Sequence, residues 1–136
     1  MKPLDQNMFV SGQITPADLP DIARAGIRTV INNRPDGEEP GQPTSADIAA
    51  AAGALGLSYH EIPISRGIPD GAAEDMADAL EGSPAPALAF CKSGTRSTFL
   101  WALARARAGD DPEDLRAKAA AAGYDLTPIA PLMQSM

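Results

Sequence analysis

Short apolar runs alternate with longer alanine-rich stretches along most of the 136-residue chain. Four apolar runs have the length and residue types of β-strands, at residues 8–10, 27–31, 57–64 and 87–90. Alanine-rich stretches that open with helix-capping residues lie between them. This alternation predicts a layered α/β domain.

The predicted helices begin at capping residues, and several of them end at a glycine. They span residues 15–26, 44–55, 70–80, 97–107 and 111–123, and residues 127 and 128 open one last turn. Proline follows the cap at two of these starts, after Thr15 and after Asp111. The run 8–10 is short enough for an edge strand, and Pro63 places the run 57–64 near a sheet edge or a strand end.

Length, composition and charge narrow the classes of function. The length fits one domain spanning residues 1–136, and 44% hydrophobic with 21% charged residues is typical of a globular protein. Eleven basic and 18 acidic residues give a formal net charge of −7, which repels nucleic-acid phosphates and anionic lipids. Aromatic residues, at 4%, are too few for a base-stacking surface. We therefore expect no nucleic-acid partner and no membrane partner.

The chain has one cysteine, Cys91, and one histidine, His60. A single cysteine cannot form an intramolecular disulfide or a thiolate zinc cluster within this chain, and the carboxylates lack metal-ligand spacing. We expect no metal and no cofactor. The first residues lack the pattern of a secretory signal, and no apolar stretch approaches about 18 residues. These features predict a reducing, cytoplasmic location, and they leave the oligomeric state open.

Cys91 stands where the apolar run 87–90 ends and the next helix is about to begin. Four residues separate it from Arg96, namely Lys92, Ser93, Gly94 and Thr95. Backbone amides that turn inward around such a loop, together with the helix N-terminus, bind anions, and an arginine can add a two-point hydrogen bond. The same field favours the thiolate, which is the nucleophilic form of cysteine. The segment 92–96 is therefore predicted to bind an anion beside a nucleophilic cysteine.

Simpler interpretations exist for the same residues. Cys91 could be a small buried hydrophobe at a strand end, and Arg96 an ordinary exposed arginine at a helix start. The fixed spacing of cysteine, glycine, arginine and serine favours the functional interpretation, because a positive charge at a helix N-terminus is unfavourable without an anion. Gly94 supplies backbone torsions that other residues resist, and Ser97 could donate a hydrogen bond to the sulfur.

Three segments together resemble the bacterial beta-lactamase-hydrolase-like phosphatase-like domains. They are residues 9–13, 29–39 and 91–97, so the resemblance covers nearly the whole chain. That family is similar to dual-specificity and tyrosine phosphatases, which implies a three-layer α/β fold with a mostly parallel central sheet flanked by helices. The resemblance implies that Cys91 is the nucleophile, Arg96 the phosphate clamp and Ser97 the leaving-group helper. Members occur alone or fused to metallo-hydrolase or sulfide-oxidising domains, which implies a connection to sulfur metabolism.

The chain departs from the phosphatase pattern at two points. Phosphatases place five residues between the cysteine and the arginine, whereas this chain has four, the spacing of many single-domain rhodaneses. Rhodaneses are sulfurtransferases that carry a persulfide on their loop cysteine. The residue before the cysteine is histidine in tyrosine phosphatases and Phe90 here, which removes one hydrogen-bonding support for the thiolate.

A phosphatase also needs a general acid to protonate the departing oxygen. Asp70 is the best-placed carboxylate, although the role of a helix N-cap also explains it, and Asp36 is the runner-up in a polar loop. Arg34 and Arg66 stand at predicted strand ends and could rim an anion pocket, or simply be solvated. His60 is less suited to be a general base, since it lies within a predicted strand.

Three functions follow from these observations. The first is a cysteine-dependent phosphatase that acts on a small-molecule or protein phosphate ester through a thiophosphate on Cys91. The second is a rhodanese-like sulfurtransferase or persulfide-handling protein that uses the same cysteine on a sulfur substrate. The third is a non-catalytic anion-binding module that regulates a partner. The full-length resemblance favours the first, and the loop length favours the second.

Overall fold

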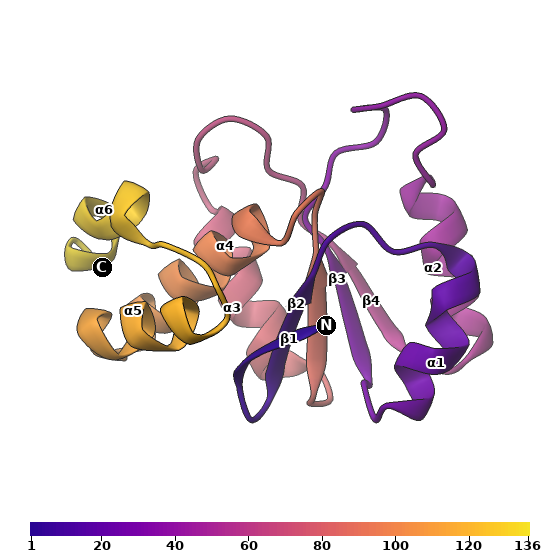
Figure 1. Ribbon diagram of the computed structural model, residues 1–136, viewed down its shortest axis with the longest axis horizontal. Coiled ribbons are helices and arrows are strands. Elements are labelled where there is room, and N and C mark those ends of the chain that lie inside the picture. The colour runs from indigo at the N-terminus through magenta and orange to yellow at the C-terminus, as the bar shows by residue number, and fades with distance from the viewer.

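The computed structural model describes residues 1–136, and it consists of a five-stranded sheet with helices on both faces (Figure 1). The strand order is β1-β2-β5-β3-β4. Strands β2, β5, β3 and β4 run parallel, and β1 pairs antiparallel with β2. This arrangement confirms the predicted three-layer α/β fold with a mostly parallel central sheet.

The strands are short and the helices longer. The strands are β1 (Lys2–Asp5), β2 (Met8–Ser11), β3 (Thr29–Asn32), β4 (Ser58–Glu61) and β5 (Ala87–Phe90). The helices are α1 (Leu19–Arg24), α2 (Ser45–Ala54), α3 (Ala72–Gly82), α4 (Thr95–Arg107), α5 (Pro112–Ala121) and α6 (Ala130–Gln134). Two 3₁₀ turns, η1 (Pro16–Asp18) and η2 (Thr127–Ile129), precede α1 and α6.

The two faces of the sheet pack against different helices. Helices α1 and α2 cover one face, and α3 to α6 lie on the other (Figure 1). The alternation of β5 matches this division, since Leu88 and Phe90 belong to the core under α1 and α2, whereas Ala87 and Ala89 belong to the core under α4. The small alanine side chains leave room for α4 close to the sheet, and α4 begins directly after the cysteine loop.

The prediction of an edge strand at residues 8–10 is wrong. Strand β2 lies inside the sheet, between β5 and β1. Strand β1 forms the edge, and the sequence pattern does not reveal it because Leu4 is its one buried residue. The other edge strand is β4, as the proline at position 63 predicts.

Local capping signals place most helix starts correctly. The Thr44 hydroxyl accepts a hydrogen bond from the Asp47 amide at 3.1 Å at the start of α2, and Asp111 is the N-cap of α5. The N-cap of α3 is Gly71 and not Asp70. The capping role that the sequence suggested for Asp70 is therefore wrong. Trp101, on α4, is buried in the core.

Candidate active site

Cys91 lies at the centre of the sheet's carboxyl edge. It directly follows β5, which is flanked by β2 and β3, so loops from both neighbours surround it. The Ser11 carbonyl accepts a hydrogen bond from the Cys91 amide at 3.4 Å, and the Asn33 amide donates to the Phe90 carbonyl at 2.9 Å. Both groups belong to the peptide bond that precedes Cys91, so the ends of β2 and β3 hold this peptide bond from both sides.

The turn from β5 into α4 directs a backbone amide at the sulfur. The Gly94 N–H donates to Cys91 Sγ across 3.1 Å, and the thiol is fully buried. Gly94 is the N-cap of α4 and has a φ of +91°, a left-handed conformation that glycine adopts most easily. The loop thus has the predicted strand-to-helix geometry, with the partial positive charge of α4 directed at the cysteine.

Arg96 holds a carboxylate and a backbone carbonyl. Its two terminal nitrogens donate to both oxygens of Glu38, at 2.7 and 2.8 Å, and one of them also donates to the Ile64 carbonyl at 2.8 Å. These bonds join the cysteine loop to the loops that follow β3 and β4. The Glu38 carboxylate raises the pKa of Arg96 above its ordinary value, and in return hydrogen bonding to Arg96 is the main cause that lowers the pKa of Glu38 to about 2.

A second arginine shares this acidic loop. Arg34 follows β3 and is only 4% exposed. Its Nε donates to Glu38 at 2.8 Å, its Nη2 to Glu39 at 2.8 Å and its Nη1 to Gln13 at 2.9 Å. Every arm of this buried guanidinium therefore has a polar partner, as burial requires. Arg34 lies beside Arg96 and is buried, so the alternative of a simply solvated arginine is wrong, while its role at an anion pocket stays a prediction.

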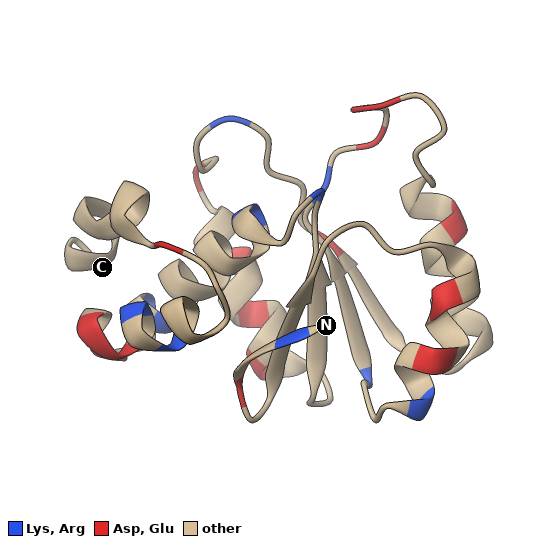
Figure 2. Cartoon of the chain, viewed as in Figure 1, with Lys and Arg blue, Asp and Glu red and all other residues tan.

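Lys92 completes a cluster of three cations at this edge. Its ammonium lies 2.9 Å from Glu39, and hydrogen bonding to Lys92 is the main cause that lowers the pKa of Glu39. The cluster lines an open pocket of about 360 Å³ together with the two glutamates, and the five residues are Arg34, Glu38, Glu39, Lys92 and Arg96. Figure 2 shows the acidic loop after β3 and basic positions near the start of α4 at the same end of the sheet.

Ser97 and Thr98 are buried on the first turn of α4 but differ in their partners. The Thr98 hydroxyl donates to the Gly94 carbonyl at 2.8 Å, which fixes the loop. The Ser97 hydroxyl has no hydrogen-bond partner, so the predicted bond from Ser97 to the sulfur is not made in this conformation. Burying a hydroxyl without a hydrogen-bond partner costs folding free energy, and this one lies on the first turn of α4, directly after the cysteine loop.

Tyr124 is a neighbour of the loop that the sequence analysis did not identify. Its hydroxyl donates to the Ser93 carbonyl at 3.1 Å, while the Ser93 hydroxyl donates to Thr95 Oγ1 at 3.1 Å. Burial, and secondarily the electrostatic effect of the nearby Cys91, raises the pKa of Tyr124 above its ordinary value. The sequence signal is weak, since Tyr124 lies 33 positions after the cysteine and follows a helix end.

The candidate acids lie apart from the cation cluster. Asp70 is exposed and lines a different pocket, between the segment 68–74 and residues of α4 and the C-terminal segment, and none of the residues 91–96 lines that pocket. Asp36 accepts a hydrogen bond from the Ser45 amide at 2.8 Å, which ties it to the start of α2. The structure therefore brings together Cys91 and Arg96 but does not bring either aspartate to them.

Two other residues considered from the sequence lie away from this cluster. His60 forms a hydrogen bond between its Nε2 and the Ser83 hydroxyl at 2.7 Å, beside α3. Arg66 is exposed in the loop that follows β4, and it does not line the pocket of Arg34 and Arg96. No three His, Cys, Asp or Glu side chains are grouped so that they could hold a metal ion.

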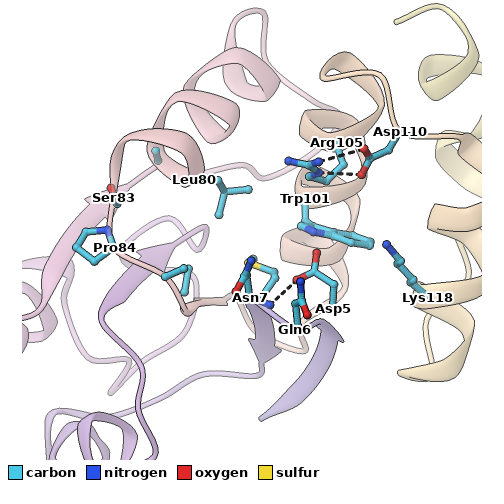
Figure 3. A pocket seen from close by; sticks show the side chains of 14 residues that line it. Asp5, Gln6, Asn7, Leu80, Ser83, Pro84, Trp101, Arg105, Asp110 and Lys118 are labelled. Atoms are coloured by element: carbon cyan, nitrogen blue, oxygen red, sulfur yellow. Dashed lines mark hydrogen bonds and ion pairs between the residues drawn. The ribbon is translucent and has the colours of Figure 1, made fainter.

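The largest cavity, of about 630 Å³, lies at the opposite end of the parallel strands. Asn7, Trp101, Arg105 and Lys118 are among its lining residues, and Arg105 is paired there with Asp110 (Figure 3). Cys91 and Arg96 are absent from this cavity. Size alone does not indicate the site here, because Cys91 and Arg96, the predicted nucleophile and anion clamp, lie at the carboxyl edge of the sheet.

Residues 1–108 match the family described as beta-lactamase hydrolase-like protein, phosphatase-like domain. The chain belongs to this family. Curated relatives are beta-lactamase hydrolase-like proteins of Agrobacterium fabrum, 36% identical over 107 residues, and of Xylella fastidiosa, 36% identical over 125 residues. These matches cover 78% and 90% of the chain but only 25% and 29% of the relatives, so the chain spans a little over a quarter of their length.

Solved structures show the same fold. A Neisseria meningitidis protein described as a candidate phosphatase aligns with a TM-score of 0.84 at 34% identity, covering 98% of this chain and 96% of that one. The structure of PTPMT1 aligns with a TM-score of 0.73 at 11% identity, covering 98% and 94%, and it bears on the fold alone. The family and the fold support a phosphatase-like hydrolase. No helix of the chain has the length and apolar character needed to cross a membrane.

Proposed function

We propose that this chain is a cysteine-dependent hydrolase of phosphate esters. The observation that carries the proposal is the loop between β5 and α4, where a backbone amide donates to Cys91 Sγ and Arg96 follows within one helical turn. A helix N-terminus and an arginine stabilise both a thiolate and the equatorial oxygens of a transferring phosphoryl group. The phosphatase-like family and the similar fold of the Neisseria protein support the same reaction class.

In the first step the Cys91 thiolate attacks phosphorus, and the bond from phosphorus to the ester oxygen breaks. The products are a thiophosphate on Cys91 and an alcohol, which takes its proton from a general acid. Water then attacks the thiophosphate, inorganic phosphate leaves, and the sulfur departs as a thiolate. In this proposal Ser97 turns toward the sulfur and donates a hydrogen bond that stabilises it as a leaving group.

We assign the general acid to Asp70. The Ile64 carbonyl accepts a hydrogen bond from Arg96, so the segment 65–71 begins at the anion pocket although Asp70 lies beyond it. The role therefore requires this segment to move toward Arg96 when substrate binds. Glu38 is a poor donor in comparison, because its lowered pKa of about 2 keeps it ionised near neutral pH.

The spacing of four residues between Cys91 and Arg96 favours a second candidate function, transfer of sulfane sulfur through a persulfide on Cys91. The shorter loop gives a smaller cradle than the five-residue phosphatase loop. Sulfur transfer from a thiosulfate-like donor expels a stable anion, so it needs no general acid.

The experiment compares the parent protein with Cys91→Ser and Asp70→Asn on aryl phosphates of graded leaving-group pKa, and on thiosulfate with cyanide as acceptor. We expect Cys91-dependent phosphate release, and a loss of roughly 10²- to 10⁴-fold in Asp70→Asn for poor leaving groups only. Asp75→Asn, an exposed position on α3, is the matched control. Acid quenching followed by mass spectrometry should find one phosphoryl group on Cys91.

Two results would overturn the proposed phosphatase function. Thiocyanate formation that needs Cys91 but not Asp70, without phosphate release, would establish the sulfurtransferase. Anion binding without either turnover would establish a non-catalytic binding module.

A further inference from the structure

Three cations from separate segments meet at one pocket. Arg34 comes from the end of β3, Lys92 from the cysteine loop and Arg96 from the first turn of α4. No apolar residue lines this pocket. Phosphoryl chemistry at Cys91 needs one clamp, which Arg96 supplies, so two cations remain without a role in the proposed reaction.

Arg34 connects two anionic positions. Its Nε and the fork of Arg96 share the Glu38 carboxylate, while its Nη2 and Lys92 share the Glu39 carboxylate. Because Arg34 is nearly fully buried, its guanidinium is held in place and requires anionic or polar partners at all times. The pocket therefore presents two adjacent anion positions that are bridged by a fixed guanidinium.

The side chains of the two glutamates are more exposed to solvent than that of the arginine they bind. The side chains of Glu38 and Glu39 are 26% and 49% exposed, against 5% for Arg34. The Glu38 amide donates to the Gln42 side chain at 3.1 Å, and that side chain donates to the Pro35 carbonyl at 2.8 Å. These two hydrogen bonds connect the two ends of the segment 35–42. Both carboxylates therefore belong to one internally hydrogen-bonded surface loop.

We infer that this pocket binds a phosphate ester that carries a second anionic group next to the phosphate. This inference rests on the proposed function, which places the reacting phosphate at Arg96. In the free protein Glu38 and Glu39 fill the two anion positions, and the ligand takes them over by exchange of one anion for another. The charge on the three cations is compensated before and after the exchange, so no cation is left buried and unpaired.

Calorimetry on the Cys91→Ser protein tests the inference, with inorganic phosphate and pyrophosphate as probes in metal-free buffer. Pyrophosphate should bind roughly 10- to 100-fold more tightly, because it gains charged hydrogen bonds at the second position. Arg34→Gln should remove this preference, and Glu39→Gln should strengthen pyrophosphate binding by removing a competing carboxylate. Arg28→Gln, at the other end of β3, changes the net charge equally and should preserve the preference.

Equal affinity for the two probes overturns the inference. A preference that survives Arg34→Gln also overturns it. If that variant does not fold, Lys92→Gln decides in its place, since the Lys92 side chain is 64% exposed. Turnover of aryl phosphates by the parent protein reports on the proposed function separately: turnover without the preference refutes only the two-anion pocket, and the preference without turnover refutes only the phosphatase reaction.

Discussion

At the scale of single residues, the loop around Cys91 tolerates little change, and Gly94 is its tightest point. A Cβ at Gly94 would overlap the Tyr124 hydroxyl, and the φ of +91° is strained for any other residue. Gly94→Ala should lower the free energy of unfolding by more than the roughly 1–2 kcal/mol of left-handed strain. Chemical denaturation measures the change.

Gly109→Ala is the matched control for this prediction. Gly109 has a φ of +105°, and a Cβ there would meet no atom within 4 Å, so its substitution reports the strain without the overlap. Adding Tyr124→Phe to Gly94→Ala should recover part of the loss. Equal losses at the two glycines would contradict the predicted role of Tyr124.

The loss of a hydroxyl should destabilise the protein at Thr98 but not at Ser97. Ser97→Ala removes a buried hydroxyl without a partner, so the stability should stay constant or rise by up to about 1–3 kcal/mol. Thr98→Val breaks the bond to the Gly94 carbonyl and should cost roughly 1 kcal/mol or more. Thermal unfolding separates the two, and a large loss in Ser97→Ala would mean that its hydroxyl has a partner in solution.

The catalytic effect of Ser97→Ala is a separate measurement on the same variant. If Ser97 assists the departing sulfur, breakdown of the thiophosphate slows, and the phosphorylated protein accumulates during turnover. Normal breakdown would remove Ser97 from the mechanism.

At the scale of elements, the loop after β3 should make stability depend on pH through Glu38. Its pKa falls from an ordinary 4.5 to about 2 in the folded protein. The unfolded chain therefore binds this proton first as the pH falls, so the stabilisation is complete above about pH 4.5 and is lost as the pH approaches 2. Glu38→Gln should lower the free energy of unfolding near neutral pH and should make it depend less on pH between about 4.5 and 2.

Urea unfolding at several pH values between 2 and 6 measures how the free energy of unfolding depends on pH. Glu113→Gln, at an exposed position on α5, is the control and should keep the parent's pH dependence. If Glu38→Gln loses stability with falling pH as steeply as the parent protein does, other carboxylates dominate acid unfolding.

At the scale of the whole molecule, the C-terminal segment belongs to the core although the family match ends at residue 108. Six buried residues of this segment join the cluster under α4, namely Leu115, Ala119, Ala122, Leu126, Ile129 and Met133. A chain ending at residue 108 would expose one side of α4 and lose Tyr124 from the loop. It should therefore lose cooperative thermal unfolding and bind a hydrophobic dye, whereas full-length Tyr124→Phe should not.

The sequence predicts what is local in this molecule. The end of β5 at Cys91, the caps Thr44 and Asp111, and the stop at Gly26 depend on neighbouring residues, and the structure agrees with each. The resemblance to a known family added the order of the layers.

What the sequence did not predict depends on distant segments. Glu38 is 58 positions from the Arg96 that it binds, and no spacing rule connects them. The inner place of β2 likewise depends on β1, whose few apolar residues give no strand signal. Asp70 is the best-placed carboxylate in the sequence, but the path of its loop, which depends on distant segments, places it in a pocket that Arg96 does not line.

The two glutamates on the cations also affect how fast an anion can arrive. The pocket holds three positive and two negative side chains in a molecule whose formal net charge is −7. The net negative charge of the molecule repels a distant dianion. The cations of the pocket attract it only once it is closer than the Debye length, about 8 Å at physiological ionic strength. Added salt should therefore accelerate association and also accelerate dissociation, so that anions exchange most rapidly at high ionic strength. Stopped-flow measurements over a range of salt concentrations would reveal both trends.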